Sequence, residues 1–226
     1  MTLAQLKQIS RSKIPGCTTQ AVSHALLTLI LNNACDDIAA FTVCLPANKT
    51  FDVVADQEEY PLSSNIGDFL TMDKDGLWWY DGSQWMQVDA RTREWLNKNR
   101  PTWRDLDSDD PQDYSVEGDT LLVSPPPNTD LTDGFKLYYG KTPTYMVGEG
   151  TFPFSGSTTE LTHLRPYDPV IIKFADWNLA EMLNKGVKPD VVMQEYYAMR
   201  QDVFDKCSKR RDISASGAGI FRGRRP

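Results

Sequence analysis

The sequence predicts an α+β protein in which N- and C-terminal helices pack as a bundle, with an inserted β-sandwich or small barrel and an extended C-terminal arm. Apolar residues recur at helical spacing near both ends, and short strand-like segments alternate with turn signals between them. The last stretch is basic and rich in Gly, Ser and Ala. These observations predict a helical domain (1–40 with 164–207), a β-rich domain (41–163) and an arm (208–226).

Apolar periodicity predicts two helices at the N-terminus. The first stripe runs from Leu3 to Ile14 and stops at Pro15-Gly16, a pair that breaks helices. Thr18 is the expected N-cap of a second helix, whose apolar stripe runs from Val22 to Asn33.

Two further helices are expected before the basic tail. Asp168 is a suitable N-cap and Pro169 suits the first helical position. This helix is expected to end at Gly186, with Pro189 following. A last helix then carries one apolar face over residues 192–203.

The clearest hairpin signal in the chain lies at residues 77–88. Leu77-Trp78-Trp79-Tyr80 and Gln84–Val88 flank an Asp81-Gly82-Ser83 turn, where glycine tolerates positive φ. Other short strand-like segments lie at residues 51–54, 59–62, 120–123 and 135–139. A helical turn is expected at 93–96 and an acidic loop at 105–113. Many short strands with turns between them favour a sandwich or small barrel.

The end of the chain differs sharply in charge from the rest. From Lys206 onward it holds seven of the 24 Lys and Arg and one of the 31 Asp and Glu, so its net charge is +6 and that of the preceding residues is −13. With Ile220-Phe221 as its one apolar pair, this stretch cannot bury enough surface to order itself. We interpret it as an arm that orders on a partner; the alternative is a solvated, disordered terminus.

Composition and motifs argue against several function classes. Four irregularly spaced cysteines and two histidines predict no metal site, and no cofactor is expected. There is no phosphate loop and no nucleophile elbow, and the paired acids lie in predicted loops, so an enzyme ranks last among the hypotheses. No apolar run is long enough for a membrane span, and the N-terminus does not read as a signal peptide. The acidic body disfavours general nucleic-acid binding.

The aromatic residues of the β-rich region have two interpretations. A set of six could form a sugar-stacking platform or fill the core: Trp78, Trp79, Tyr80, Trp85, Trp95 and Trp103. Because alternate strand positions face opposite sides, some of the hairpin aromatics must be core and others exposed. We favour the core for most of them, and exposed members are expected to mark an interface with other proteins.

Several strings of residues resemble a known family. Pro111-Gln112-Asp113-Tyr114 continues through Val116-Glu117-Gly118-Asp119, and Pro125-Pro126-Pro127, Leu137-Tyr138-Tyr139 and Thr142-Pro143 follow. This succession resembles the head-to-tail adaptor (connector) proteins of tailed bacteriophages. Residues 57–62 look like the strand that leads into the family's β-rich part, and residues 164–170 look like its return to the helices. The segment between Trp95 and Asp113 has no clear counterpart.

The resemblance implies a structural virion protein rather than an enzyme. Such adaptors form a ring, commonly dodecameric, in the neck between capsid and tail, where they bind the portal protein and other neck or tail proteins. They continue the channel through which genomic DNA passes without specific binding, and an acidic channel wall would let DNA slide past. Assembly in the host cytoplasm is expected, with no membrane partner.

The resemblance also assigns the tail a role, since the C-terminal arms of these adaptors often reach into the portal. The expected portal-docking residues are Lys209, Arg210, Arg211, Ile213, Ile220, Phe221, Arg222, Arg224 and Arg225. The exposed members of Trp78, Trp79, Tyr80 and Trp85 are the expected tail-facing or interface aromatics. The main alternative is a tail-associated module that uses these aromatics to bind a glycan or a host surface.

Overall fold

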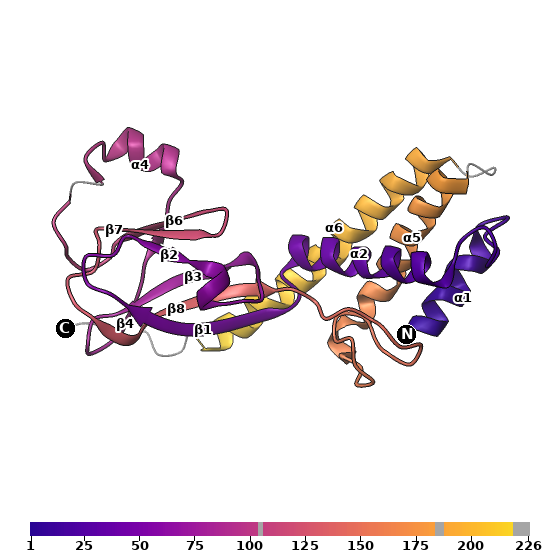
Figure 1. Ribbon diagram of the computed structural model, residues 1–226, viewed down its shortest axis with the longest axis horizontal. Coiled ribbons are helices and arrows are strands. Elements are labelled where there is room, and N and C mark those ends of the chain that lie inside the picture. The colour runs from indigo at the N-terminus through magenta and orange to yellow at the C-terminus, as the bar shows by residue number, and fades with distance from the viewer. Residues whose placement is uncertain (104–105, 184–187, 219–226) are drawn as a thin grey trace. The chain divides into compact units, whose positions relative to one another are not determined.

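The computed structural model describes the backbone of residues 1–103, 106–183 and 188–218, and the chain divides into two units (Figure 1). One unit combines the residues up to Cys44 with those from Pro143 onward and is helical. The other spans Leu45–Thr142 and contains the strands. The chain is therefore an α+β protein in which the β-rich part is inserted between helical segments.

The helical unit is built around α5. Its elements are α1 (Leu3–Lys13), α2 (His24–Thr42), the 3-10 helix η2 (Thr162–Tyr167), α5 (Asp168–Leu183) and α6 (Pro189–Ala218). Helix α5 contacts α1, α2 and α6, and it buries Val170, Ile171 and Leu179. Terminal helices far apart in the sequence thus share one core, as the apolar stripes predict.

The start of α2 differs from the prediction. Thr18 is not its N-cap, because its hydroxyl accepts the backbone N–H of Ala21 in a turn that precedes the helix. Ser23 caps α2 instead, and its hydroxyl accepts the N–H of Leu26 at 3.1 Å. Both residues have suitable side chains, so the capping rule alone does not choose between them.

Asp168 also departs from its predicted role as the N-cap of α5. It has helical φ and ψ and is the first residue of the helix, directly after η2. Its carboxylate accepts a hydrogen bond of 2.6 Å from the Met1 ammonium. The aspartate therefore ties the start of α1 to the start of α5.

The β unit consists of two four-stranded sheets rather than one closed barrel, so the sandwich alternative holds. The first sheet has the order β1-β8-β3-β4, with β1 at Pro46–Val53, β8 at Leu131–Lys141, β3 at Phe69–Tyr80 and β4 at Trp85–Gln87. The second has the order β2-β7-β6-β5, with β2 at Glu59–Pro61, β7 at Thr120–Ser124, β6 at Asp113–Glu117 and β5 at Asp89–Ala90. All pairings are antiparallel except that of β5 with β6.

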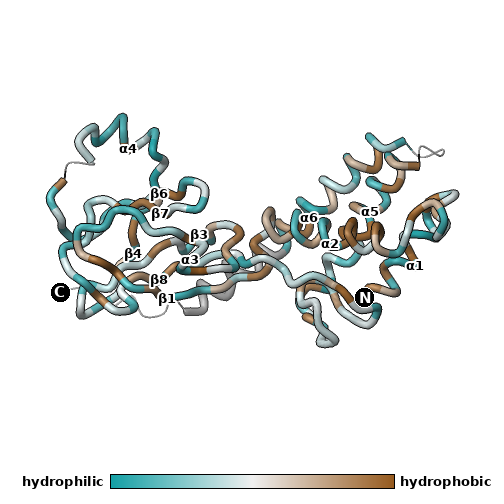
Figure 2. Tube along the Cα trace, in the orientation of Figure 1, coloured by the Kyte–Doolittle hydropathy of each residue, from teal (hydrophilic) through white to brown (hydrophobic). Residues whose placement is uncertain are grey.

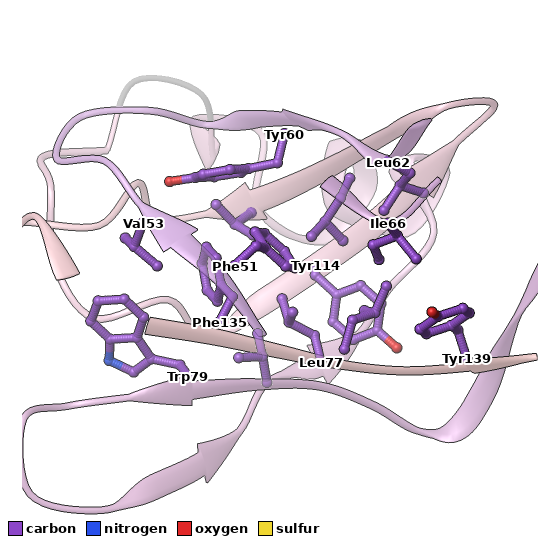
Figure 3. Close-up of a cluster of buried hydrophobic side chains, with 14 residues drawn as sticks. Phe51, Val53, Tyr60, Leu62, Ile66, Leu77, Trp79, Tyr114, Phe135 and Tyr139 are labelled. Atoms are coloured by element: carbon purple, nitrogen blue, oxygen red, sulfur yellow. The ribbon is translucent and has the colours of Figure 1, made fainter. Parts of the chain in front are cut away.

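The core of the β unit lies between the two sheets. Phe51, Leu77, Trp79 and Phe135 come from the first sheet and pack with residues of the second, such as Tyr60 (Figure 3). The rings of Tyr60 and Phe135 meet edge to face, with their centroids 5.2 Å apart. These contacts between sheets bury the apolar side of each one.

Two short helices decorate the sandwich. Helix α3 (Leu62–Asn65) follows β2, and α4 (Arg93–Asn99) follows β5. The predicted helical turn at residues 93–96 is thus confirmed, and Thr92 caps it by accepting the N–H of Trp95. The trace of α4 is mostly hydrophilic (Figure 2).

Residues 143–163 belong to the helical unit, although the sequence analysis assigned them to the β-rich domain. The Asn32 amide of α2 donates to the carbonyl of Met146 at 3.1 Å and accepts its N–H at 2.9 Å. Leu3 N–H donates to the carbonyl of Thr151 at 2.9 Å. Because this segment forms no strand and hydrogen-bonds α1 and α2, it folds with the helices.

The expected extended arm differs from the structure over its first half. Helix α6 continues to Ala218, so the backbone of residues 208–218 is helical and not extended. Lys, Arg and Ala are good helix formers and no proline interrupts this stretch, so the preceding helix propagates into it. The side chains of 207–218 and all of 219–226 lie outside the described residues, as do residues 104–105 and 184–187.

Candidate functional site

The outer face of the first sheet carries a cluster of aromatic side chains. Trp78 and Tyr80 of β3 alternate with the buried Leu77 and Trp79, so they point away from the core. Trp85 lies opposite Tyr80 in the β3–β4 hairpin. We call Trp78, Tyr80, Trp85 and Tyr138 the aromatic face.

The strand register arranges this face in rows. One row crosses all four strands and consists of Thr50, Lys136, Trp78 and Gln87. Tyr138 lies two residues beyond Lys136 on β8, and its ring meets that of Trp78 at 66° with centroids 6.5 Å apart. The rings of Tyr80 and Trp85 are 5.3 Å apart and tilted by 44°. Trp85 is 38% exposed and the other three are half-buried.

Polar groups surround these rings. The indole N–H of Trp78 donates to the carbonyl of Asp75 at 2.9 Å, which satisfies the ring's one donor. Asp81, in the hairpin turn, accepts hydrogen bonds from Ser83 and Gln84. Those bonds, led by the Gln84 backbone N–H, lower the pKa of the Asp81 carboxyl, so it stays ionised at neutral pH. Asp133 accepts the Thr50 hydroxyl at 2.5 Å.

The outer face of the second sheet is covered. Trp103 and Leu96 are buried against Leu122 of β7, with Trp95 packed beside them. Beneath α4 lies Asp113, which is 1% exposed. Its carboxylate contacts Arg91 Nε at 3.3 Å and Arg100 Nη1 at 2.5 Å. The acidic loop predicted at 105–113 is thus wrong at its last residue, because Asp113 begins β6 and is paired with two arginines.

A third cluster ties α6 to α2 shortly before the basic tail. Asp37 accepts the Tyr196 hydroxyl and the guanidinium of Arg200, the latter at 2.6 Å. Arg200 also lies over the ring of Phe41 at 4.0 Å and that of Tyr197 at 5.0 Å. Burial, together with the hydrogen bond to Asp37, raises the pKa of Tyr196, so this hydroxyl keeps its proton. The cluster anchors α6 one to two turns before Lys206.

The structure describes the predicted aromatic residues but not the side chains of the predicted portal-docking residues. The four hairpin aromatics separate as strand alternation requires: Trp79 is 1% exposed and belongs to the core, so it is not one of the exposed members expected at an interface. Trp78, Tyr80 and Trp85 lie together on the outer face. The portal-docking residues 209–225 lie outside the part of the chain whose side chains are described, and that assignment stays a prediction.

Two features of these clusters, Tyr138 as a member of the aromatic face and the Asp37–Arg200 pair, were not predicted from the sequence. The alternation of Phe135, Leu137 and Tyr139 with Lys136 and Tyr138 was a usable signal for the first. The second joins residues 163 positions apart and leaves no local pattern.

Neither metal chemistry nor a membrane span is indicated in the described part of the chain. Within residues 1–103, 106–183 and 188–206, no three His, Cys, Asp or Glu side chains are grouped so that they could hold a metal ion. In the same ranges no helix combines the length and apolarity needed to cross a bilayer.

The two units define an α+β protein with an exposed aromatic sheet face and a helical unit that continues into a basic tail. A family model described as SU10 adaptor protein matches residues 1–221, and the chain belongs to that family. A comparison with curated proteins finds no match. Membership makes the chain a phage adaptor-type structural protein, a virion component that associates with other head and tail proteins.

Proposed function

We propose that this chain is the head-to-tail adaptor of a tailed phage and assembles as a dodecameric ring between portal and tail. The observation that carries the proposal is the family match over residues 1–221, which spans both units. In this role the ring continues the DNA channel and presents a platform to the tail, and the chain has no catalytic activity.

The β unit and the basic tail carry opposite net charges, and each charge suits one part of this role. The β unit holds 9 Lys and Arg against 19 Asp and Glu, a net charge of −10. The tail from Lys206 carries +6. An acidic wall repels the phosphate backbone and lets DNA pass, whereas a basic tail with Ile220-Phe221 suits an acidic, partly apolar docking site on the portal.

Ring assembly offsets the cost of ordering the tail. A short segment with one apolar pair gains little from a single contact and loses conformational entropy when it binds. In a ring every tail is held near the portal, so each docking event raises the effective concentration of the next. The Asp37–Arg200 cluster supports this arrangement by anchoring α6 before the tail begins.

Electron microscopy of the purified protein, alone and with its portal protein, tests the ring. We expect closed rings at least in the presence of the portal protein. A protein that stays monomeric under both conditions would contradict the proposal.

Deletion of Ser208–Pro226 tests the tail. The Asp37–Arg200 cluster is retained, so we expect the melting temperature to change little while portal association is lost; helical circular dichroism should fall only by the contribution of residues 208–218. Two milder variants separate the contributions of charge and of apolar contact. One replaces Arg222, Arg224 and Arg225 with Gln and removes charge. The other combines Ile220→Ser with Phe221→Ser and removes the apolar anchor. If the truncated protein binds the portal normally, the tail has no docking role.

A glycan-binding module remains the second candidate, and the aromatic face is the feature on which it depends. Its rings are tilted against one another by 44° and 66° and do not form a flat platform. Stacking of extended sugars favours coplanar, open ring faces, so the geometry supports a protein interface better.

A further inference from the structure

We propose that the aromatic face binds an arginine-bearing basic segment of a partner protein. The inference rests on the proposed adaptor function only in assuming a protein partner. It concerns a surface of the β unit, not the basic tail.

Within the β unit, the rings of the aromatic face are exposed or half-buried. The opposite outer face of the same sandwich is covered by Leu96 and Trp103. Trp, Tyr and Arg are enriched at protein interfaces, where a rigid ring buries much area at little entropic cost. Three half-buried rings and a 38% exposed Trp85 on one sheet face form such a patch.

Carboxylates lie at the edges of the aromatic face, and Lys136 lies within it. The carboxylate of Asp133 lies at Thr50, at one end of the row across the sheet. The backbone carbonyl of Asp75, an exposed residue, lies at the other end and accepts from Trp78 Nε1 and from the Gln87 amide. Asp81 follows Tyr80 in the hairpin turn. Within a unit of net charge −10, these acids favour a cationic partner and disfavour nucleic acid.

The cation that best fits rings next to carboxylates is a guanidinium. It stacks on an aromatic face and pairs with a carboxylate in the same geometry, which a compact ammonium does less well. The chain uses this arrangement twice. Arg91 lies over the Trp95 ring at 4.6 Å and pairs with Asp89 at 2.8 Å. Arg200 lies over Phe41 and pairs with Asp37.

The polar atoms of the aromatic face are arranged for such a partner. Trp78 has its indole N–H satisfied by Asp75, so only its apolar ring surface is offered. Lys136 lies over the Tyr138 ring at 5.1 Å, which shows that this ring already accepts a cation on one side. The half-buried ring of Tyr80 and the exposed ring of Trp85, in the hairpin whose turn contains Asp81, are the positions where an incoming arginine gains most.

Isothermal titration calorimetry on the full-length chain tests the proposal with a synthetic peptide of alternating Arg and Gly. The comparison peptide replaces each Arg with Lys, and maltohexaose serves as the glycan probe. We expect the Arg peptide to bind at least fivefold more tightly than the Lys peptide, with no heat from maltohexaose. Raising the salt concentration should weaken the peptide binding.

Variants locate the site. Trp85→Ala and Asp81→Asn should each weaken binding of the Arg peptide by about fivefold or more. Trp85 is exposed, and Asp81→Asn keeps the oxygen that accepts from Ser83 and Gln84, so folding is expected to be retained. Trp95→Ala, on the opposite outer face, is the matched control and should change binding less than twofold. Gel filtration and circular dichroism verify that each variant is folded.

Several results would overturn the proposal. They are no binding of the Arg peptide, equal binding of the Arg and Lys peptides, or equal losses in Trp85→Ala and Trp95→Ala. Maltohexaose binding that is lost in Trp85→Ala would reassign the face to glycans. None of these measurements uses the portal or the ring, so their failure is distinct from failure of the proposed adaptor function.

Discussion

The two outer faces of the β sandwich are both formed by β-strands, but one is covered by other residues and the other carries exposed and half-buried rings. On the β2-β7-β6-β5 sheet, α4 and Trp103 cover the strands and two arginines neutralise the buried Asp113. On the β1-β8-β3-β4 sheet, aromatic side chains lie at the surface, with the carboxylates of Asp133 and Asp81 at the edges of the face. Large rings alone therefore do not decide whether a face is core or interface; the cover supplied by the adjoining chain does.

The largest expected effect distinguishes the two faces by stability. Trp103→Ala removes a ring that is 2% exposed and uncovers Leu122, so we expect a loss of about 3–5 kcal/mol in the free energy of unfolding. Trp85→Ala, the matched change on the aromatic face, should stay within about 1 kcal/mol. Urea unfolding followed by near-UV circular dichroism measures both. Equal losses would abolish the distinction between the faces.

A glycine between the faces should have the next largest effect. Gly76 has a φ of +55°, and a Cβ there would lie 2.4 Å from the hydroxyl of Tyr114, which belongs to the other sheet. We expect Gly76→Ala to cost about 2–3 kcal/mol. Gly118 has a φ of +59° but open space around its Cβ, so Gly118→Ala should cost about 1 kcal/mol. The difference between the two, read from unfolding curves, reports how closely the sheets approach.

The covered face also depends on its buried charge. Asp113→Asn keeps the shape of the side chain but leaves Arg91 and Arg100 without their carboxylate. Because both arginines are more than a third exposed, water replaces part of the lost interaction, and we expect a loss of about 1–2 kcal/mol. Asp81→Asn on the aromatic face should leave stability unchanged within about 0.5 kcal/mol. A stability loss in the second but not the first would reverse the comparison.

The smallest effect concerns the core that both faces share and appears at alkaline pH. Burial raises the pKa of Tyr60 to about 12, whereas an exposed tyrosine has a pKa of about 10. The unfolded chain therefore loses this proton first. The stabilising contribution is complete below about pH 10 and is lost as the pH rises through 12.

Tyr60→Phe tests this pH dependence. It removes the hydroxyl that donates to the Val54 carbonyl at 3.2 Å, so it should cost about 1 kcal/mol at pH 8. The difference in melting temperature between the variant and the unmodified protein should shrink between pH 10 and 12. A difference that stays constant over this range would show that Tyr60 does not cause the alkaline loss.

Local signals in the sequence predicted the local structure of both faces. The Asp-Gly turn predicted the β3–β4 hairpin, and Tyr80 does pair with Trp85. The helical turn at 93–96 was also predictable from a few residues. Strand alternation required that Trp78 and Trp79 face opposite sides, but not which of them faces inward.

Pairings between distant residues decided the rest. Asp113 follows a run of acids and resembled a loop residue, yet Arg91 and Arg100 hold it inside β6. Met146 lies among turn residues and joins the helical unit through Asn32, 114 positions earlier. No window of neighbouring residues contains such contacts, which is why the covered face and the boundary after Thr142 could not be predicted.

The strand pair that opens and closes the insertion has a consequence for evolution. Pro46, near the start of β1, lies opposite Gly140 near the end of β8, and Lys141 N–H donates to the Leu45 carbonyl at 3.0 Å. The chain thus leaves and re-enters the helices through neighbouring positions. A different domain with equally close ends could replace the sandwich at this point while the helices stay unchanged.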